Sequence, residues 1–213
     1  MAWKLCVGFI LVGFVAIRCW DRSHNQSLNL LFLDVGQGDS ILLELPSGKR
    51  ILVDGGGGFG KSDIGKRLVV PELARRSILS LDALWLTHPD ADHAGGFKGV
   101  LEEMKVGELW VQESFMREPV RLLKEIIQLA RQNGTQLRLF NKDITELISG
   151  VEIRLHWLGD QGPENNRSLV GEISFAGCKI LLTGDIEAPA EEKLLNGLPP
   201  LDILKVAHHG SKT

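Results

Sequence analysis

Two histidines and two aspartates lie within six consecutive positions of this chain, in the run His88-Pro89-Asp90-Ala91-Asp92-His93. The run follows the apolar stretch 84–86, which is typical of a buried strand. Imidazoles and carboxylates bind divalent metal ions, and a loop at the carboxyl end of a strand can aim several of them at one point. An alternative is a polar loop in which Asp92 caps a helix. The chain has only six histidines, so two within one loop favour a metal site.

Three further positions combine an apolar strand-like run with an acidic residue or a histidine at its end. Asp54 follows residues 51–53, Asp185 follows 181–184, and the pair His208-His209 follows 204–207. A glycine lies beside each of these positions, and glycine permits a sharp turn and a close approach of the backbone. We therefore expect these side chains to converge with the 88–93 run.

The remaining pattern predicts an α/β domain in which helices cover sheets. A turn signal at 46–49 joins two strands into a hairpin. Strands are predicted at 30–33, 40–45, 50–53, 82–87, 108–112, 136–140, 151–158, 169–176, 179–183 and 203–207, and helices at 64–76, 93–104, 118–133 and 188–196.

The composition suits one globular domain. With 213 residues, of which 44% are hydrophobic, the chain can bury a core. The net charge of -3 lacks the bulk basic character of a dedicated nucleic-acid-binding domain. Three cysteines without C-x-x-C spacing predict no disulfide or cysteine metal framework.

The two ends of the sequence are unusual. Residues 5–17 form an unbroken apolar run of thirteen, which is short of the roughly twenty residues that span a bilayer. No small-x-small cleavage site follows it. We expect a membrane anchor or signal-like segment at 1–20, with a buried core helix as the alternative, a linker at 21–28 and the folded domain at 29–213. Because the sequence stops just after a strand-like run and a histidine pair, we expect the C-terminal strands of the domain to be missing.

Five separate motifs carry a family resemblance. The chain resembles the metallo-β-lactamase fold, and within it the C-terminal domain of ComEC-family DNA-internalisation proteins. The motifs are Leu33-Asp34-Val35-Gly36-Gln37-Gly38-Asp39-Ser40, Leu52-Val53-Asp54-Gly55-Gly56, Thr87 to Gly96, Leu181 to Glu187 and Leu204 to Thr213. The resemblance implies an αββα sandwich.

The resemblance also implies a set of ligands. His88, Asp90, Asp92 and His93 would bind metal directly, Asp185 would bridge two ions, and the pair His208-His209 would supply one more ligand, with His209 preferred. Asp54 would orient a ligand histidine from behind, and Asp39 would either support the site or cap the Gly-Gln-Gly turn. Asp92 and His93 would be the catalytic residues, with Asp92 able to shuttle a proton.

Two departures from relatives of this fold affect the expected metal. Many relatives carry a histidine at the position of Asp90, and another where this chain has the loop 164–168. Asn165 or Asn166 could offer a weaker oxygen ligand there, and Lys61 in the glycine-rich segment could contact phosphate. Because carboxylates favour harder ions, we expect two divalent ions, either Mn²⁺ or Zn²⁺.

The resemblance implies a metal-dependent phosphodiesterase or nuclease that degrades the non-imported strand during competence DNA uptake. It would be a bacterial membrane protein with the hydrolase on the outer face, with DNA, the membrane and other uptake components as partners. One alternative is a metallo-hydrolase of a small ester, lactone or phosphoester. The other is a non-catalytic accessory domain that binds DNA or a partner.

Overall fold

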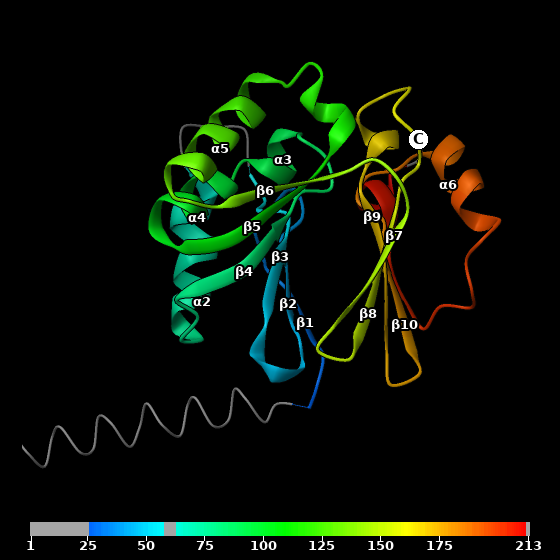
Figure 1. Cartoon of the computed structure of the whole chain (residues 1–213), viewed down its shortest axis with the longest axis horizontal. Coiled ribbons are helices and arrows are strands. Elements are labelled where there is room, and N and C mark those ends of the chain that lie inside the picture. The colour runs from blue at the N-terminus through cyan, green and yellow to red at the C-terminus, as the bar shows by residue number, and fades with distance from the viewer. Residues whose placement is uncertain (1–25, 58–62, 212–213) are drawn as a thin grey trace, which may run out of the picture.

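Two β-sheets pack face to face, and helices cover both outer faces (Figure 1). The computed structural model describes residues 26–57 and 63–211. The first sheet has six strands in the order in which the chain makes them. β1 to β3 are antiparallel and β3 to β6 are parallel. The strands are β1 (Asn29–Phe32), β2 (Ile41–Glu44), β3 (Arg50–Val53), β4 (Ser80–Trp85), β5 (Lys105–Gln112) and β6 (Gln136–Phe140).

The second sheet has five strands in the order β11-β10-β9-β8-β7. Its strands are antiparallel except for the parallel pair β10 and β11. The sequence analysis missed β7, a five-residue strand that pairs with β8 at the edge of this sheet. These strands are β7 (Ile144–Ile148), β8 (Val151–His156), β9 (Val170–Phe175), β10 (Cys178–Leu182) and β11 (Ile203–Lys205).

Helices enclose the sheets from either side (Figure 1). On α5, residues 123, 126, 127 and 130 are buried, which is the i, i+3, i+4, i+7 spacing of one helix face. A π-helical turn, η2 (Gly65–Val69), leads directly into α2, whose Pro71 stands in the first turn where a missing N–H is tolerated. The α-helices are α2 (Val70–Arg75), α3 (Ala91–Ala94), α4 (Phe97–Glu103) and α5 (Arg121–Gln132) on the first sheet, and α6 (Ala188–Leu195) on the second.

Three apolar layers hold this arrangement together. Residues such as Leu84 and Phe97 fill the layer between the first sheet and its helices. Trp85, Trp110 and their neighbours fill the layer between the two sheets. A smaller cluster that includes Leu194 lies under α6. The order helix, sheet, sheet, helix confirms the αββα sandwich predicted from the sequence.

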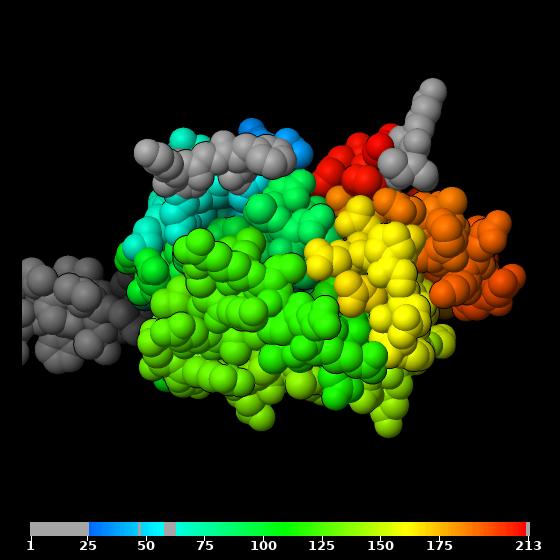
Figure 2. Space-filling model, turned by 90° about the horizontal axis from the view of Figure 1, so that it is seen from above, coloured from blue at the N-terminus to red at the C-terminus, as the bar shows by residue number. Residues whose placement is uncertain are grey.

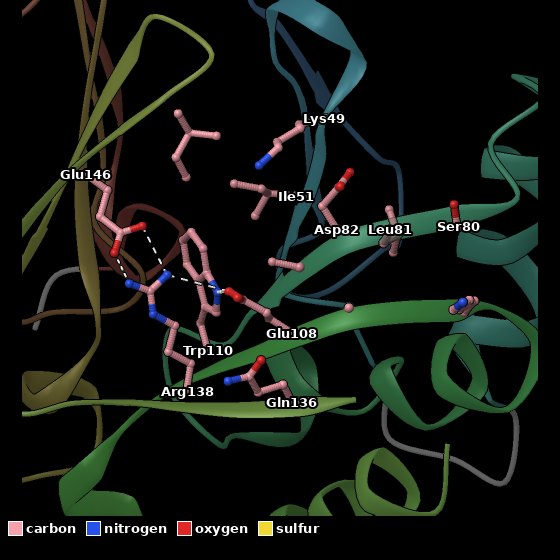
Figure 3. Close-up of a pocket in the computed structure, with 14 residues that line it drawn as sticks. Lys49, Ile51, Ser80, Leu81, Asp82, Glu108, Trp110, Gln136, Arg138 and Glu146 are labelled. Carbon is pink, nitrogen blue, oxygen red and sulfur yellow. Dashed lines mark hydrogen bonds and ion pairs between the residues drawn. The ribbon is translucent and has the colours of Figure 1, made fainter. Parts of the chain in front are cut away.

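The two ends of the sandwich differ. At the end where β4, β5 and β6 begin, the sheets leave a cavity of about 570 Å³ between them. Figure 3 shows Arg138 in this cavity, pointing toward Glu146, with Trp110 and Glu108 beside it. The indole Nε1 of Trp110 donates a hydrogen bond to Glu108 at 2.6 Å. The acidic and histidine residues of interest lie at the other end, where the strands finish.

The N-terminal anchor predicted at 1–20 and most of the 21–28 linker lie outside the described residues, as does Lys61. Among the residues that the structure does describe, none of the helices is both long and apolar enough to cross a bilayer.

Candidate metal centre

Four strands deliver the acidic and histidine side chains to one end of the sandwich. Asp54 follows β3, and the 88–93 run follows β4 in the first sheet. Asp185 follows β10, and the turn η5 (Ala207–Gly210) follows β11 in the second sheet. Figure 2 views the molecule from above. The red segment near the C-terminus lies there between the blue-to-green first half of the chain and the orange segment that precedes it. The cluster therefore lies at the junction of the two sheets.

His88 and His93 are the buried centre of this cluster. Their ring centroids are 4.2 Å apart. His88 closes the extended segment after β4, and His93 lies in the short helix α3 that turns back over the strand ends. Gly38 makes this fold-back possible, because a Cβ there would lie 1.7 Å from the backbone oxygen of Asp92. Its φ of +94° also favours glycine.

Asp54 fixes the orientation of the His93 ring. Its Oδ2 lies 2.8 Å from Nδ1 of His93 and accepts a hydrogen bond from Thr87 Oγ1 at 2.7 Å. Its Oδ1 accepts the backbone N–H of Thr87 at 2.9 Å. Because Nδ1 donates its proton to the carboxylate, Nε2 of His93 is left to face the cluster.

Asp185 and His209 complete the cluster from the second sheet. Asp185 Oδ2 lies 3.2 Å from His93 Nε2 and 3.3 Å from His209 Nε2. The His93 and His209 rings are stacked with centroids 5.3 Å apart. His208 and His209 both have positive φ, which turns the chain sharply after β11. This turn places His209, rather than His208, among the carboxylates.

Lys205 is a member of the cluster that the sequence analysis did not identify. Its ammonium contacts Oδ2 of Asp39, lies 3.4 Å from Oδ1 of Asp185, and donates to the backbone oxygen of Gly184 at 3.0 Å. The side chain is only 8% exposed. Lys205 therefore neutralises part of the negative charge that Asp39 and Asp185 bring together.

The surroundings set the protonation of the two central histidines. Burial, followed by the charge of His93, lowers the pKa of His88 to about 4, so its ring is neutral near pH 7. Burial alone would lower the pKa of His93, but Asp54 and Asp185 outweigh it and raise that pKa to about 10.

The carboxylates respond to the same neighbours. Burial opposes ionisation of Asp185, yet His93 and Lys205 hold its pKa well below its usual range. Burial raises the pKa of Asp39, although Lys205 opposes the shift.

The donor set fits divalent metal ions. Nε2 of His93 is buried and faces Asp185 Oδ2 at 3.2 Å without a hydrogen bond of normal geometry among the described residues, as expected of a metal-binding atom beside a second ligand. Four overlapping groups of side chains each bring three ligand atoms within 4.8 Å of one another. The groups are His88, His93 and Asp185; Asp92, His93 and His209; Asp39, Asp185 and His209; and Asp39, Asp54 and His93.

Other residues proposed from the sequence lie at the margin. Asp90 is close to the cluster, with Oδ2 3.7 Å from His88 Nε2, but its side chain is 45% exposed. Asn165 and Asn166 are directed toward Glu187 at the start of α6, and the amide oxygen of Asn166 accepts the Glu187 backbone N–H at 2.8 Å. The His208 ring lies 6.5 Å from that of His209.

A family model described as the metallo-beta-lactamase superfamily matches residues 33–213. The chain is 33% identical over 198 residues to ComE operon protein 3 of Bacillus subtilis, covering 84% of this chain and 25% of that protein. It is 32% identical over 218 residues to recombination protein 2 of Haemophilus influenzae, covering 97% of this chain and 24% of that protein. The chain thus spans about a quarter of the length of these relatives.

A solved structure shares the fold. The metallo-beta-lactamase SMB-1, in a complex with mercaptoacetic acid, superposes with a TM-score of 0.57 at 15% sequence identity, covering 88% of this chain and 82% of that chain. This likeness concerns the fold alone. The chain is also 27% identical over 207 residues to competence protein ComA of Neisseria gonorrhoeae, covering 96% of this chain and 27% of that protein. These relatives agree with the ComEC-like motifs found in the sequence.

Proposed function

This chain belongs to the metallo-beta-lactamase superfamily, and from that premise we propose that it is a metal-dependent hydrolase that cleaves phosphodiester bonds of DNA. One observation supports the chemistry above all. The buried Nε2 of His93 has no hydrogen bond of normal geometry among the described residues, while Asp54 holds the opposite nitrogen of the same ring. A histidine oriented in this way is prepared to bind a metal ion.

Two divalent ions, Mn²⁺ or Zn²⁺, are the proposed cofactors. His88, His93, Asp185 and His209 would hold them, with Asp92 at the rim and the more exposed Asp90 as an additional oxygen ligand. Such ions would activate water at neutral pH and stabilise negative charge on the phosphoryl oxygens. The three carboxylates among these six residues favour the harder Mn²⁺ more than a set made only of imidazoles would.

The residues of the chain have distinct tasks in this reaction. Asp54 keeps Nε2 of His93, the ring nitrogen that would bind metal, directed at the cluster. Lys205 limits repulsion between Asp39 and Asp185 while leaving one oxygen of Asp185 near both His93 and His209. Asp92 is half-buried at the rim, where it accepts a hydrogen bond from Gln37 Nε2 at 3.5 Å. From that position it can pass a proton to the leaving oxygen.

DNA as the substrate is supported by the names of the relatives, which include a recombination protein and a competence protein. We propose that the chain degrades the strand that is not imported during DNA uptake. We also propose that it works at the bacterial membrane, on the outer face, together with other uptake components.

The test is hydrolysis by the full chain in Mn²⁺, in Zn²⁺ and in EDTA. Single-stranded DNA, double-stranded DNA and bis(p-nitrophenyl) phosphate would be offered in parallel. We expect metal-dependent cleavage of DNA, and a loss of at least a hundredfold in Asp185→Asn. The exposed Asp202, whose carboxylate accepts the backbone N–H of Lys179, provides Asp202→Asn as the matched control.

Cleavage in EDTA, or equal rates in Asp185→Asn and wild type, would refute the metal centre. Cleavage of the small ester without cleavage of DNA would retain a metallo-hydrolase and refute DNA as its substrate.

A further inference from the structure

A second cavity lies on the far side of the loop that carries His88 and Asp90. Its volume is about 380 Å³, and Pro89, the residue between those two side chains, forms part of its wall. The other walls come from η3 (Glu113–Met116) after β5 and from the loop ahead of β9. In Figure 2 the green segment around residue 115 and the yellow segment around residue 160 meet on one face of the molecule. The cavity therefore adjoins the candidate metal centre without being part of it.

Two buried polar groups at this cavity lack partners. The Oγ atom of Ser114 is buried without a hydrogen bond among the described residues, and Ser114 as a whole is only 6% exposed. The Nε atom of Arg167 is buried and likewise unpaired in the described part of the chain. A hydroxyl and a guanidinium N–H can both donate, so each of these two atoms lacks an acceptor among the described residues. A buried donor without an acceptor lowers the stability of the folded state, and an oxygen atom of a ligand would supply that acceptor.

The guanidinium of Arg167 is held in place for such a ligand. It lies over the ring of Phe115, with its carbon 4.8 Å from the ring centroid. The turn that carries it is closed by Ser168, whose Oγ donates to the Asn165 backbone oxygen at 2.7 Å. A planar guanidinium fixed in this way is suited to phosphate oxygens, which it can contact through two N–H groups.

The acidic residues of the cavity decide which phosphate can bind. Asp160 is paired with Arg117 at 2.6 Å. Glu118 and Glu164 also line the walls and would oppose a free anion. A phosphate tethered to a group already held at the metal centre has a high effective concentration and can overcome this repulsion.

We infer that this cavity, through Arg167 and Ser114, binds a phosphate of a polynucleotide that neighbours the phosphodiester at the metal centre. This inference rests on the proposed function and gives the enzyme a preference for a polymer over a single ester. Arg167 and Ser114 would then determine specificity and take no part in bond cleavage.

The test measures binding and cleavage separately on the full chain. Binding of a fluorescein-labelled single-stranded DNA decamer with nuclease-resistant phosphorothioate linkages is followed by anisotropy in Mn²⁺, so that the metal centre can hold the neighbouring linkage. Arg167→Met and Ser114→Ala are compared with Arg131→Met, which removes an exposed arginine from the distant end of α5. We expect decamer affinity to fall about tenfold in Arg167→Met and severalfold in Ser114→Ala, as for loss of a charge-assisted or a neutral hydrogen bond. Arg131→Met should bind like wild type.

In the metal-loaded enzyme, the ratio of kcat/KM for the decamer to kcat/KM for bis(p-nitrophenyl) phosphate should fall about tenfold in Arg167→Met. Millimolar inorganic phosphate should compete poorly with the decamer. Equal effects of Arg167→Met and Arg131→Met, an unchanged ratio, or strong competition by free phosphate would overturn the inference. If the decamer binds through Arg167 but is never cleaved, the proposed function would be refuted, while the inference that the cavity binds a phosphate would be retained.

Discussion

Nδ1 of His93 lies 2.8 Å from Oδ2 of Asp54, although the two residues are 39 positions apart in the sequence. The hydrogen bond joins the end of β3 to the helix α3 that follows β4. It also determines which ring nitrogen of His93 faces the carboxylates of the second sheet. The behaviour of the metal centre should therefore depend on a residue that need not touch the metal.

Replacing Asp54 by asparagine removes the negative charge behind His93 while preserving the size of the side chain. Because hydrogen bonds behind ligand histidines fix ring orientation and raise basicity, we expect metal affinity to fall by about 10- to 100-fold. Competition with a fluorescent chelator measures the affinity, and Asp202→Asn is the matched control. Wild-type affinity in Asp54→Asn would show that Asp54 does not support the ligand.

Lys205→Met should destabilise the metal-free protein. The change leaves the buried carboxylate of Asp185 and the partly buried carboxylate of Asp39 without the ammonium that contacts both. Removing one partner from a buried charge group typically costs about 3–5 kcal/mol. Because a divalent ion can replace the missing positive charge, Mn²⁺ should restore most of the free energy of unfolding. Urea unfolding in EDTA and in Mn²⁺ measures both effects, and an equal response of wild type and variant to Mn²⁺ would contradict this role.

Metal binding should release a proton from His93. The pKa of about 10 in the metal-free protein means that the ring carries two protons near pH 7, one of them on the nitrogen that faces the cluster. The metal must displace that proton, so affinity should rise with pH until the ring is deprotonated. His88, with a pKa of about 4, should contribute no proton near neutrality. Calorimetry in buffers of different ionisation enthalpy counts the protons released, and a count near zero at pH 7 would contradict the prediction.

Gly171→Ala should force the two sheets apart. A Cβ at Gly171 would lie 1.8 Å from the six-membered ring of Trp85, which reaches across from the first sheet. Overpacking of a core commonly costs about 1–3 kcal/mol, and this contact is closer than any side chain can accept without movement. Thermal unfolding measures the loss. Gly197→Ala, where a Cβ would meet open space, is the control and should change the unfolding temperature little.

Candidate metal-binding residues can be predicted from the sequence where they lie close together in the chain or directly follow an apolar strand. Two imidazoles and two carboxylates in six positions are conspicuous in any fold, and so is an aspartate at the end of an apolar strand. These patterns predicted the strands β3, β4 and β10 and the convergence of Asp54, His93 and Asp185 beyond them.

Lys205 could not be identified in this way. Within β11 it reads as an ordinary charged residue of a short strand, and its role follows only from the parallel pairing of β11 with β10. That pairing sets Lys205 opposite Leu182, at the strand end that leads to Asp185. The partners of Asn165 and Asn166 depend in the same way on how the 164–168 loop packs against the start of α6, which the local sequence does not define. Strand β7 was missed because it is a short edge strand with partly exposed residues.

The candidate ligands are divided between the two sheets, with His88 and His93 on one side and Asp185 and His209 on the other. An ion that bridges the two sides would tie together segments that lie 92 to 121 positions apart in the chain. It would act as a non-covalent cross-link, and its binding free energy would add to the cooperativity of folding. Withdrawal of the metal would then weaken the docking of the second sheet on the first as well as abolish catalysis, so that metal supply would govern the lifetime of the folded domain.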